Sequence, residues 1–159
     1  MEFGCLPVAI GSMPHKDPHA ACRQVLRHLP QIPSWPQLTA LSTLENQYLQ
    51  ISEGFPGLSP LENGLRLDRA AFDARLEGLY QASLDHDFRR YPISPPYASG
   101  LHTFLSLGWR PDCVAVKGQM SGPVSWGLSL TQPDGRPAIY DETIADAVAK
   151  FMKLKAAWQ

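Results

Sequence analysis

Two short segments place glycine and serine after an apolar run, an arrangement that suits the binding of a small polar ligand. The first is AIGSMPHKDP, residues 9–18, and the second is CVAVKGQMSGP, residues 113–123. Gly11 permits backbone conformations that are closed to other residues, and it lets a ligand approach the main chain. In α/β proteins, the loops that follow strand ends lie where ligands bind. We therefore expect the loops after these two apolar runs to present small and polar groups to a ligand.

Three side chains near these segments could also line the cleft, and each has an ordinary structural alternative. His15 lies in the first loop, where it would act as a general acid, contact a phosphate, or simply touch the start of the next helix. Lys117 ends an apolar run, so it either faces an anionic group in the cleft or extends to the rim. Trp126 follows the second loop and would stack on a flat ligand, although most tryptophans serve the core or an interface.

The spacing of cysteine and histidine argues against a metal site made wholly by this chain. Cys5, Cys22 and Cys113 form no Cys-x-x-Cys pair, and the five histidines share no helical His-x-x-x-His face. We expect reduced thiols that pack as small hydrophobes. The Asp-His-Asp cluster at 85–87 adjoins two arginines, which favours a solvated helix end over a metal site.

The overall composition predicts one soluble domain with a substantial core. The chain has 159 residues, 44% of them hydrophobic, and a formal net charge of −1. It has no basic stripe, which argues against nucleic-acid binding, and no apolar stretch of about 18 residues that would span a membrane. The N-terminus lacks a basic region followed by an apolar one, so we expect a cytoplasmic protein.

Apolar periodicity and end signals predict alternating strands and helices. In the first third of the chain we expect a strand at 6–10, a helix at 18–29 capped by Asp17, a proline-limited short strand at 32–40, and a helical segment at 44–55. The later predictions are a hairpin at 58–68 around Asn63–Gly64, a helix from Asp68, a helix at 94–108 closed by Gly108, an apolar strand at 113–117, a turn or small hairpin at 131–141, and a last helix capped by Asp141. This alternation predicts an α/β fold with some parallel pairing.

Three stretches of the sequence carry a resemblance to a known superfamily. They are IGSMPHKDP at 10–18, the pair LEN and FPG at 44–46 and 55–57, and the segment from KGQMSGP to the last residue, 117–159. Together they resemble the superfamily of cobalamin-independent methionine synthase and uroporphyrinogen decarboxylase, above all its short, single-barrel, methionine synthase-like proteins. The resemblance implies a (β/α)8 TIM barrel. This chain, residues 1–159, would then be one domain covering roughly the first half of that barrel and ending within a helix.

The resemblance also implies which residues bind substrate. They are Ile10, Gly11, Ser12, Glu45, Ser121 and Gly122. The Ile-Gly-Ser strand end would bind the amino acid thiol through main-chain groups and the serine. A carboxylate needs N–H donors and a hydroxyl, and Gly11 and Ser12 offer both. Glu45, or alternatively Glu53, would bind the substrate amine, and the Ser121–Gly122 loop would lie beside the cleft for substrate and methyl donor.

The implied reaction is methyl transfer to a thiol such as homocysteine, as in methionine biosynthesis. In this family zinc holds the thiolate and lowers the pKa of the thiol, which ionises the nucleophile near neutral pH. The zinc ligands would lie beyond residue 159, so the resemblance assigns no cofactor and no catalytic residue to this chain, and the isolated chain is expected to be inactive. The methyl donor, a folate or a corrinoid, stays open.

Two other functions remain as alternatives. A decarboxylase of the uroporphyrinogen type binds a large polyacid, but the two best loops offer only Lys16 and Lys117 as cations. A non-catalytic half-barrel would serve as a binding or assembly module, because an open sheet edge and an uncovered apolar interior favour pairing with another copy.

Overall fold

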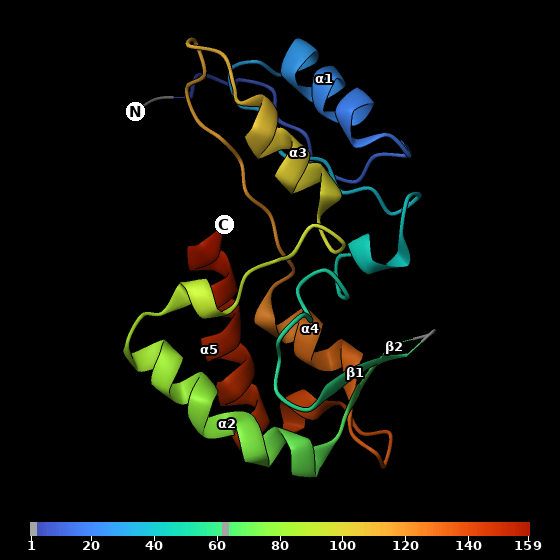
Figure 1. Ribbon diagram of the computed structural model, residues 1–159, viewed down its shortest axis with the longest axis vertical. Helices are drawn as coiled ribbons and strands as arrows, with labels where there is room; N and C mark the ends of the chain where they lie inside the picture. The colour runs from blue at the N-terminus through green and yellow to red at the C-terminus, as the bar shows by residue number, and fades with distance from the viewer. Residues whose placement is uncertain (1–2, 62–63) are drawn as a thin grey trace. The chain divides into compact units, whose positions relative to one another are not determined.

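The computed structural model describes residues 3–61 and 64–159, which group into two compact units (Figure 1). The first comprises Met1–Asn46 and Ser94–Gln119, and the second comprises Gln47–Ile93 and Met120–Gln159. The described residues form five α-helices and one small three-stranded sheet, so the chain is mixed α/β, as predicted. That sheet is not closed into a barrel. None of these helices is both long enough and apolar enough to cross a membrane.

Helix α1, Pro18–His28, begins where the sequence predicts because Asp17 caps its first turn. The Asp17 carboxylate accepts a hydrogen bond from the His19 N–H at 2.9 Å, and a proline fills the first helical position. Leu29 ends the helix directly before another proline. The helix buries one face, formed by Ala21, Cys22 and Val25.

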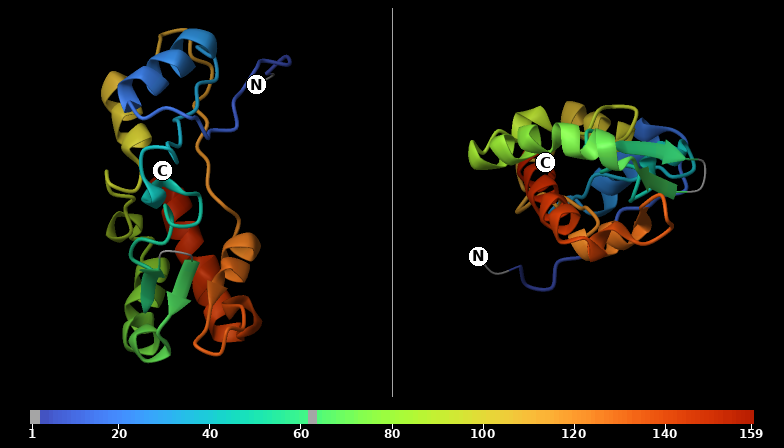
Figure 2. Two further views of the ribbon diagram at one scale, coloured as in Figure 1. Left: turned by 90° about the vertical axis from the view of Figure 1, so that its right-hand side faces the viewer. Right: turned by 90° about the horizontal axis from the view of Figure 1, so that it is seen from below.

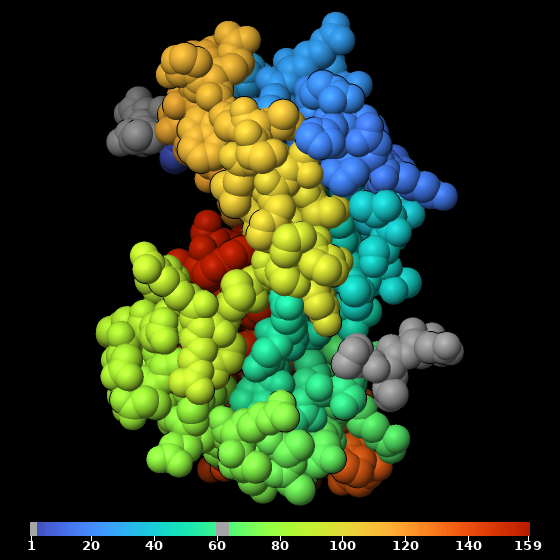
Figure 3. Space-filling model, in the orientation of Figure 1, coloured from blue at the N-terminus to red at the C-terminus, as the bar shows by residue number. Residues whose placement is uncertain are grey.

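Helix α3, Ser99–Leu107, packs against α1, and the two helices lie in contact at the surface of the first unit (Figure 3). The Cys22 thiol donates to the Gly100 carbonyl at 3.5 Å. Gly108 has a φ of 68° and ends the helix, which confirms the predicted stop.

A methyl group at Gly100 would collide with the backbone at Pro36 in the same unit, because its Cβ would lie 2.0 Å from the Pro36 carbonyl oxygen. We expect Gly100→Ala to lower the free energy of unfolding by about 2 kcal/mol. Gly78→Ala is the matched control, since its Cβ would meet only the mobile end of Arg90 and alanine favours the helix. Urea unfolding followed by tryptophan fluorescence compares the two; equal stabilities would contradict the tight contact.

Three extended segments of the first unit lie side by side in parallel. Ser12 pairs with Gln37, and Ser34 pairs with Lys117, each through a single parallel bridge. The predicted short strand at 32–40 is therefore the middle segment and carries both bridges. Since α1 connects the first segment to the second, this part of the chain has the β-α-β order expected of parallel pairing.

The predictions of regular strands at 6–10 and 113–117 are wrong: both segments are extended but lack a ladder. Ile10 is 88% exposed, so little apolar burial favours regular pairing there. The carbonyls of Ala9 and Ile10 accept instead from the Lys117 ammonium group. A side chain thus takes carbonyls that a strand ladder would otherwise use.

The sheet belongs to the second unit. Strands β1, Leu58–Leu61, and β2, Gly64–Leu67, pair antiparallel, which confirms the hairpin predicted at 58–68. Asn63 of the predicted Asn-Gly step lies outside the described residues. Strand β3, Leu130–Thr131, pairs parallel with β2.

Three helices complete the second unit, and two of them begin at predicted caps. Helix α2, Arg69–Leu84, follows Asp68, and helix α5, Glu142–Trp158, follows Asp141; each carboxylate accepts from N–H groups of the first turn. Helix α2 and helix α5 lie side by side (Figure 2). The sequence did not predict the short helix α4, Pro123–Ser129, which starts at the proline of the second loop.

Aromatic rings from several elements form the core of the second unit. Phe55 meets Trp126 edge-on, with ring centroids 5.0 Å apart, and meets Phe151 in the same way at 5.1 Å. Tyr91 meets Phe151 edge-on at 5.5 Å, and Phe72 lies 5.9 Å from Phe55. Such pairs add to the stabilisation from apolar burial.

The predicted helical segment at 44–55 is wrong. A single turn of 3₁₀ helix spans Thr43–Glu45, and turns follow as far as residue 54. Residues 50–52 are all buried. Three consecutive buried residues do not fit one face of a helix, so tertiary packing overrides the local propensity.

The predicted turn at 131–141 is confirmed. Gln132 N–H donates to the Arg136 carbonyl at 2.9 Å, which closes the turn. The segment then enters a short 3₁₀ helix, Ala138–Tyr140; a further one spans Phe88–Arg90.

Candidate strand-end site

The predicted strand end at Gly11 has a geometry that requires glycine. Gly11 has a φ of 140°, and a Cβ there would lie 2.0 Å from Nε2 of Gln119. The Gly11 carbonyl accepts from the Gln37 N–H at 2.8 Å, and the Met13 N–H donates to the Gln37 carbonyl at 2.9 Å. These bonds hold the end of the first segment against the middle one.

The two bridges determine which side chains share a face. Bridged residues point to the same side of a sheet, and side chains alternate along each segment. The Ser12–Gln37 bridge therefore places Ser12, Gln37 and Trp35 on one face. Gly11 and Ser34 fall on the other face.

Ser12 is the exposed polar group of its face. Its side chain is accessible, and so is that of Ile10, whereas Trp35 is only 2% exposed. By the same alternation, the Ser34–Lys117 bridge adds Val114 and Val116 to the face of Trp35. This face thus carries apolar side chains, with the Ser12 hydroxyl and the Gln37 amide at the carboxyl ends of its first two segments.

Lys117 ties the third segment to the first. Its ammonium group donates to the carbonyls of Ala9 at 2.9 Å and Ile10 at 3.2 Å, and to Oε1 of Gln119 at 3.3 Å. These contacts match the three donors of a lysine. Lys117 therefore fixes the backbone that leads into Gly11.

Glu45 is buried at the end of the middle segment. One carboxylate oxygen accepts from the Leu38 N–H at 2.9 Å, and the other accepts from the N–H of Ser99 at 3.1 Å and from the Ser99 hydroxyl. Since Ser99 begins α3, the negative charge also lies at the favourable end of the helix dipole. Because Leu38 directly follows Gln37, Glu45 is held at the same end of the segments as Ser12.

Three buried polar atoms of the first unit have no hydrogen-bond partner among the described residues. They are His15 Nδ1, Ser34 Oγ and Trp35 Nε1. Buried polar groups are paired in nearly all proteins, so each of them needs an explanation. The sequence singled out His15 but not the other two.

The second predicted loop belongs to the second unit. The Ser121 hydroxyl donates to the Gln47 carbonyl at 3.3 Å, and Gly122 is exposed just before α4. Trp126 is fully buried, and its indole N–H donates to the Tyr48 carbonyl at 3.0 Å. These contacts favour the core role for Trp126 over stacking on a ligand.

The residues present do not fit a zinc ion. No group of three or more His, Cys, Asp or Glu side chains in residues 3–61 and 64–159 could hold a metal. The thiols are unpaired with one another: Cys5 is exposed, Cys22 is buried and Cys113 donates to the Ala115 carbonyl at 3.2 Å. Burial raises the pKa of Cys22 to about 11, which disfavours the thiolate that a metal needs.

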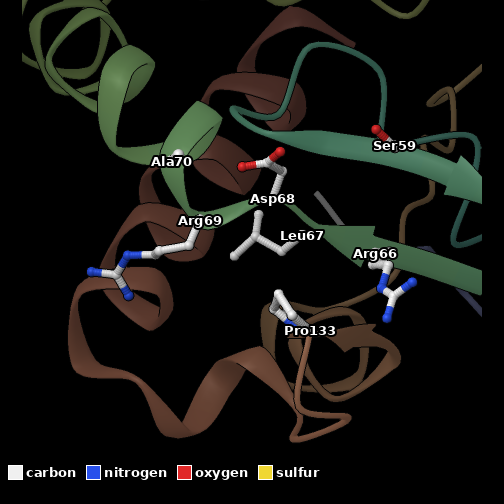
Figure 4. A pocket seen from close by; sticks show the side chains of 7 residues that line it. All are labelled: Ser59, Arg66, Leu67, Asp68, Arg69, Ala70 and Pro133. Carbon is white, nitrogen blue, oxygen red and sulfur yellow. The ribbon is translucent and has the colours of Figure 1, made fainter.

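The second unit also has an open pocket of about 510 Å³ that the sequence did not indicate (Figure 4). It is lined by Ser59, Arg66, Leu67, Asp68, Arg69, Ala70 and Pro133. Arg69 bonds Asp73 at 2.9 Å and Asp141 at 2.7 Å, and Asp68 caps α2. Two of the charged residues that line the pocket, Asp68 and Arg69, are therefore already engaged at the starts of helices α2 and α5.

The structure thus assembles Ile10, Gly11, Ser12, Glu45 and Lys117 in one unit, at the carboxyl end of parallel segments. Comparisons with family models, curated proteins and solved structures found no match to this chain.

Proposed function

We propose that this chain binds the amino acid substrate of a methyltransferase related to the cobalamin-independent methionine synthases. The observation that supports this most is the parallel bridge between Ser12 and Gln37. The Glu45 carboxylate accepts a hydrogen bond from the N–H of Leu38, the residue that follows Gln37. Ligands of open α/β proteins bind beyond the carboxyl ends of parallel strands. The β-α-β order of the first unit is also compatible with the start of a (β/α)8 barrel, which we propose as the finer fold.

The proposed ligand is a compact zwitterion such as homocysteine. The Ser12 hydroxyl is exposed and would donate to the carboxylate. Glu45 would provide the negative charge for the amine, since a carboxylate has acceptor capacity beyond the three donors it already holds.

The chain's proposed role is to bind and orient the substrate, not to activate its thiol. In the related enzymes zinc supplies that activation, and the described residues do not fit zinc. No chemical step is therefore assigned to this chain. The methyl donor would be a folate or a corrinoid.

The two alternatives have less support. A polyacid-binding decarboxylase needs several free cations, but the Lys117 ammonium is occupied by carbonyl and amide oxygens. Self-association through an open apolar face is compatible with the exposure of Val8 and Ile10, and it stays a prediction.

The test is calorimetric titration of the chain with L-homocysteine. We expect the wild type to bind and Ser12→Ala to weaken binding about 5- to 10-fold, because one hydrogen bond to a charged group is lost. Ser106→Ala is the control: this exposed serine of α3 bonds only its own helix, to the Thr103 carbonyl, and should leave the affinity unchanged. Absence of binding by the wild type would contradict the proposal, and so would equal affinities for wild type and Ser12→Ala.

A further inference from the structure

Trp35 carries a buried hydrogen-bond donor with no protein acceptor. Its side chain is 2% exposed, and its Nε1 lacks a partner in the part of the chain that the structure describes. Trp126 shows the usual arrangement, since its N–H donates to the Tyr48 carbonyl at 3.0 Å. An indole N–H is a donor only, so an acceptor from outside the described chain is what it lacks.

The indole lies on the face that carries the proposed substrate hydroxyl. Ser12 is bridged to Gln37, and Trp35 precedes Gln37 by two residues, so all three side chains share one face. On that face of the middle segment, the Trp35 side chain is the neighbour of Gln37, toward the amino end of the segment. The two donors, the Ser12 hydroxyl and the Trp35 N–H, therefore belong to neighbouring segments at one end of the unit.

The backbone of Trp35 is held from its other side. Nε2 of Gln119 donates to the Trp35 carbonyl at 3.1 Å, and the same Gln119 side chain fills the space beside Gly11. The same amide therefore bonds the Trp35 backbone and occupies the space beside Gly11. This contact fixes the segment that carries the indole before any ligand binds.

We propose that Trp35 is a ligand-binding residue, whose indole N–H donates to the carboxylate of the amino acid that Ser12 binds. The inference rests on the proposed function. A carboxylate has two oxygens and accepts several hydrogen bonds, so one hydroxyl leaves most of its capacity unused. An uncharged buried N–H supplies a second donor and gains the acceptor that the free protein lacks.

The experiment compares Trp35→Phe with Trp109→Phe in calorimetric titrations with L-homocysteine. Phenylalanine keeps the ring and removes the N–H, and Trp109 is a half-exposed tryptophan of the same unit that stacks on Phe104. We expect Trp35→Phe to weaken binding 5- to 10-fold and Trp109→Phe to leave it unchanged. In the ¹⁵N-labelled wild type, the indole N–H resonance that Trp35→Phe removes should shift when homocysteine is added.

The outcomes separate the two proposals. If the wild type does not bind homocysteine, the proposed function fails. If the wild type binds, but Trp35→Phe binds equally well and no indole resonance shifts, the inference about Trp35 is wrong while the Ser12 site stands. If Trp35→Phe does not fold, the Trp35 indole resonance is assigned in the wild type through its contacts with its own ring and backbone, and its shift decides the matter.

Discussion

Replacing Glu45 with alanine is expected to lower the free energy of unfolding by about 3 kcal/mol. The Glu45 carboxylate is buried and accepts from the Leu38 N–H, the Ser99 N–H and the Ser99 hydroxyl. Alanine would leave the buried Leu38 N–H without its acceptor and would remove the negative charge from the start of α3. The variant would thus lose the three hydrogen bonds by which Glu45 joins the end of the middle segment to α3.

Urea unfolding at pH 7 measures this change. Glu77→Ala is the matched control, because Glu77 is an exposed residue of α2 and its loss should change stability by less than about 0.5 kcal/mol. Glu45→Gln should fall between the two variants, since the amide retains one acceptor oxygen. A Glu45→Ala protein as stable as Glu77→Ala would show that the buried carboxylate does not hold the first unit together.

Replacing Lys155 with methionine is expected to stabilise the chain by about 2 kcal/mol at pH 7. Lys155 is completely buried in α5, where its Nζ donates to the Pro92 carbonyl at 2.6 Å and lies 5.3 Å from the centre of the Phe151 ring. Burial lowers the pKa of Lys155 to about 8, and the nearby charge of Glu53 opposes this only in part. Methionine would fill the space without a charge to desolvate.

The same lysine predicts how stability depends on pH. The unfolded chain holds the Lys155 proton up to its ordinary pKa of 10.5, and the folded chain releases it near pH 8. Between these values the unfolded state binds more protons, so stability rises with pH. The cost of the buried charge is fully present below pH 8 and is relieved toward pH 10.5, a change of about 3 kcal/mol.

Urea unfolding between pH 7 and 9.5 tests this effect as a difference between variants. The advantage of Lys155→Met over the wild type should shrink as pH rises, because the wild type loses its penalty. Lys153→Met, an exposed position on the same helix, should instead follow the pH dependence of the wild type. A constant difference between Lys155→Met and the wild type would contradict the lowered pKa.

The helix ends were predictable from the sequence because their determinants are local. Asp17 and Asp141 cap the helices that follow them, and Gly108 adopts the positive φ that closes α3. Each signal depends on a few neighbouring residues. The hairpin at 58–68 was predictable for the same reason.

The extended segments were harder to predict because their pairing depends on distant residues. An apolar run such as 6–10 has the composition of a buried strand, yet Ile10 is exposed and Lys117 bonds the carbonyls of Ala9 and Ile10. That contact joins residues more than 100 positions apart, which no local pattern reports. At 44–55 the sequence predicts a helix that the structure lacks, because tertiary packing buries consecutive residues there and overrides the helical propensity.

The site was predictable in part. Gly11 and Ser12 follow from a glycine and serine after an apolar run, and the resemblance adds Glu45. The burial of Glu45 and the unpaired indole N–H of Trp35 could not be predicted from the sequence. Both depend on which face each segment turns inward. One signal was available for Trp35: it lies in a proline-limited extended segment, where its ring has to occupy one face.

We propose that the carboxyl ends of the first two parallel segments bind an amino acid. Titrating the ¹⁵N-labelled chain with L-homocysteine and mapping the amide shifts tests it most directly. We predict that the largest shifts fall on Gly11, Ser12 and Gln37. No shifts at saturating homocysteine, or shifts confined to residues away from this strand end, would contradict the claim.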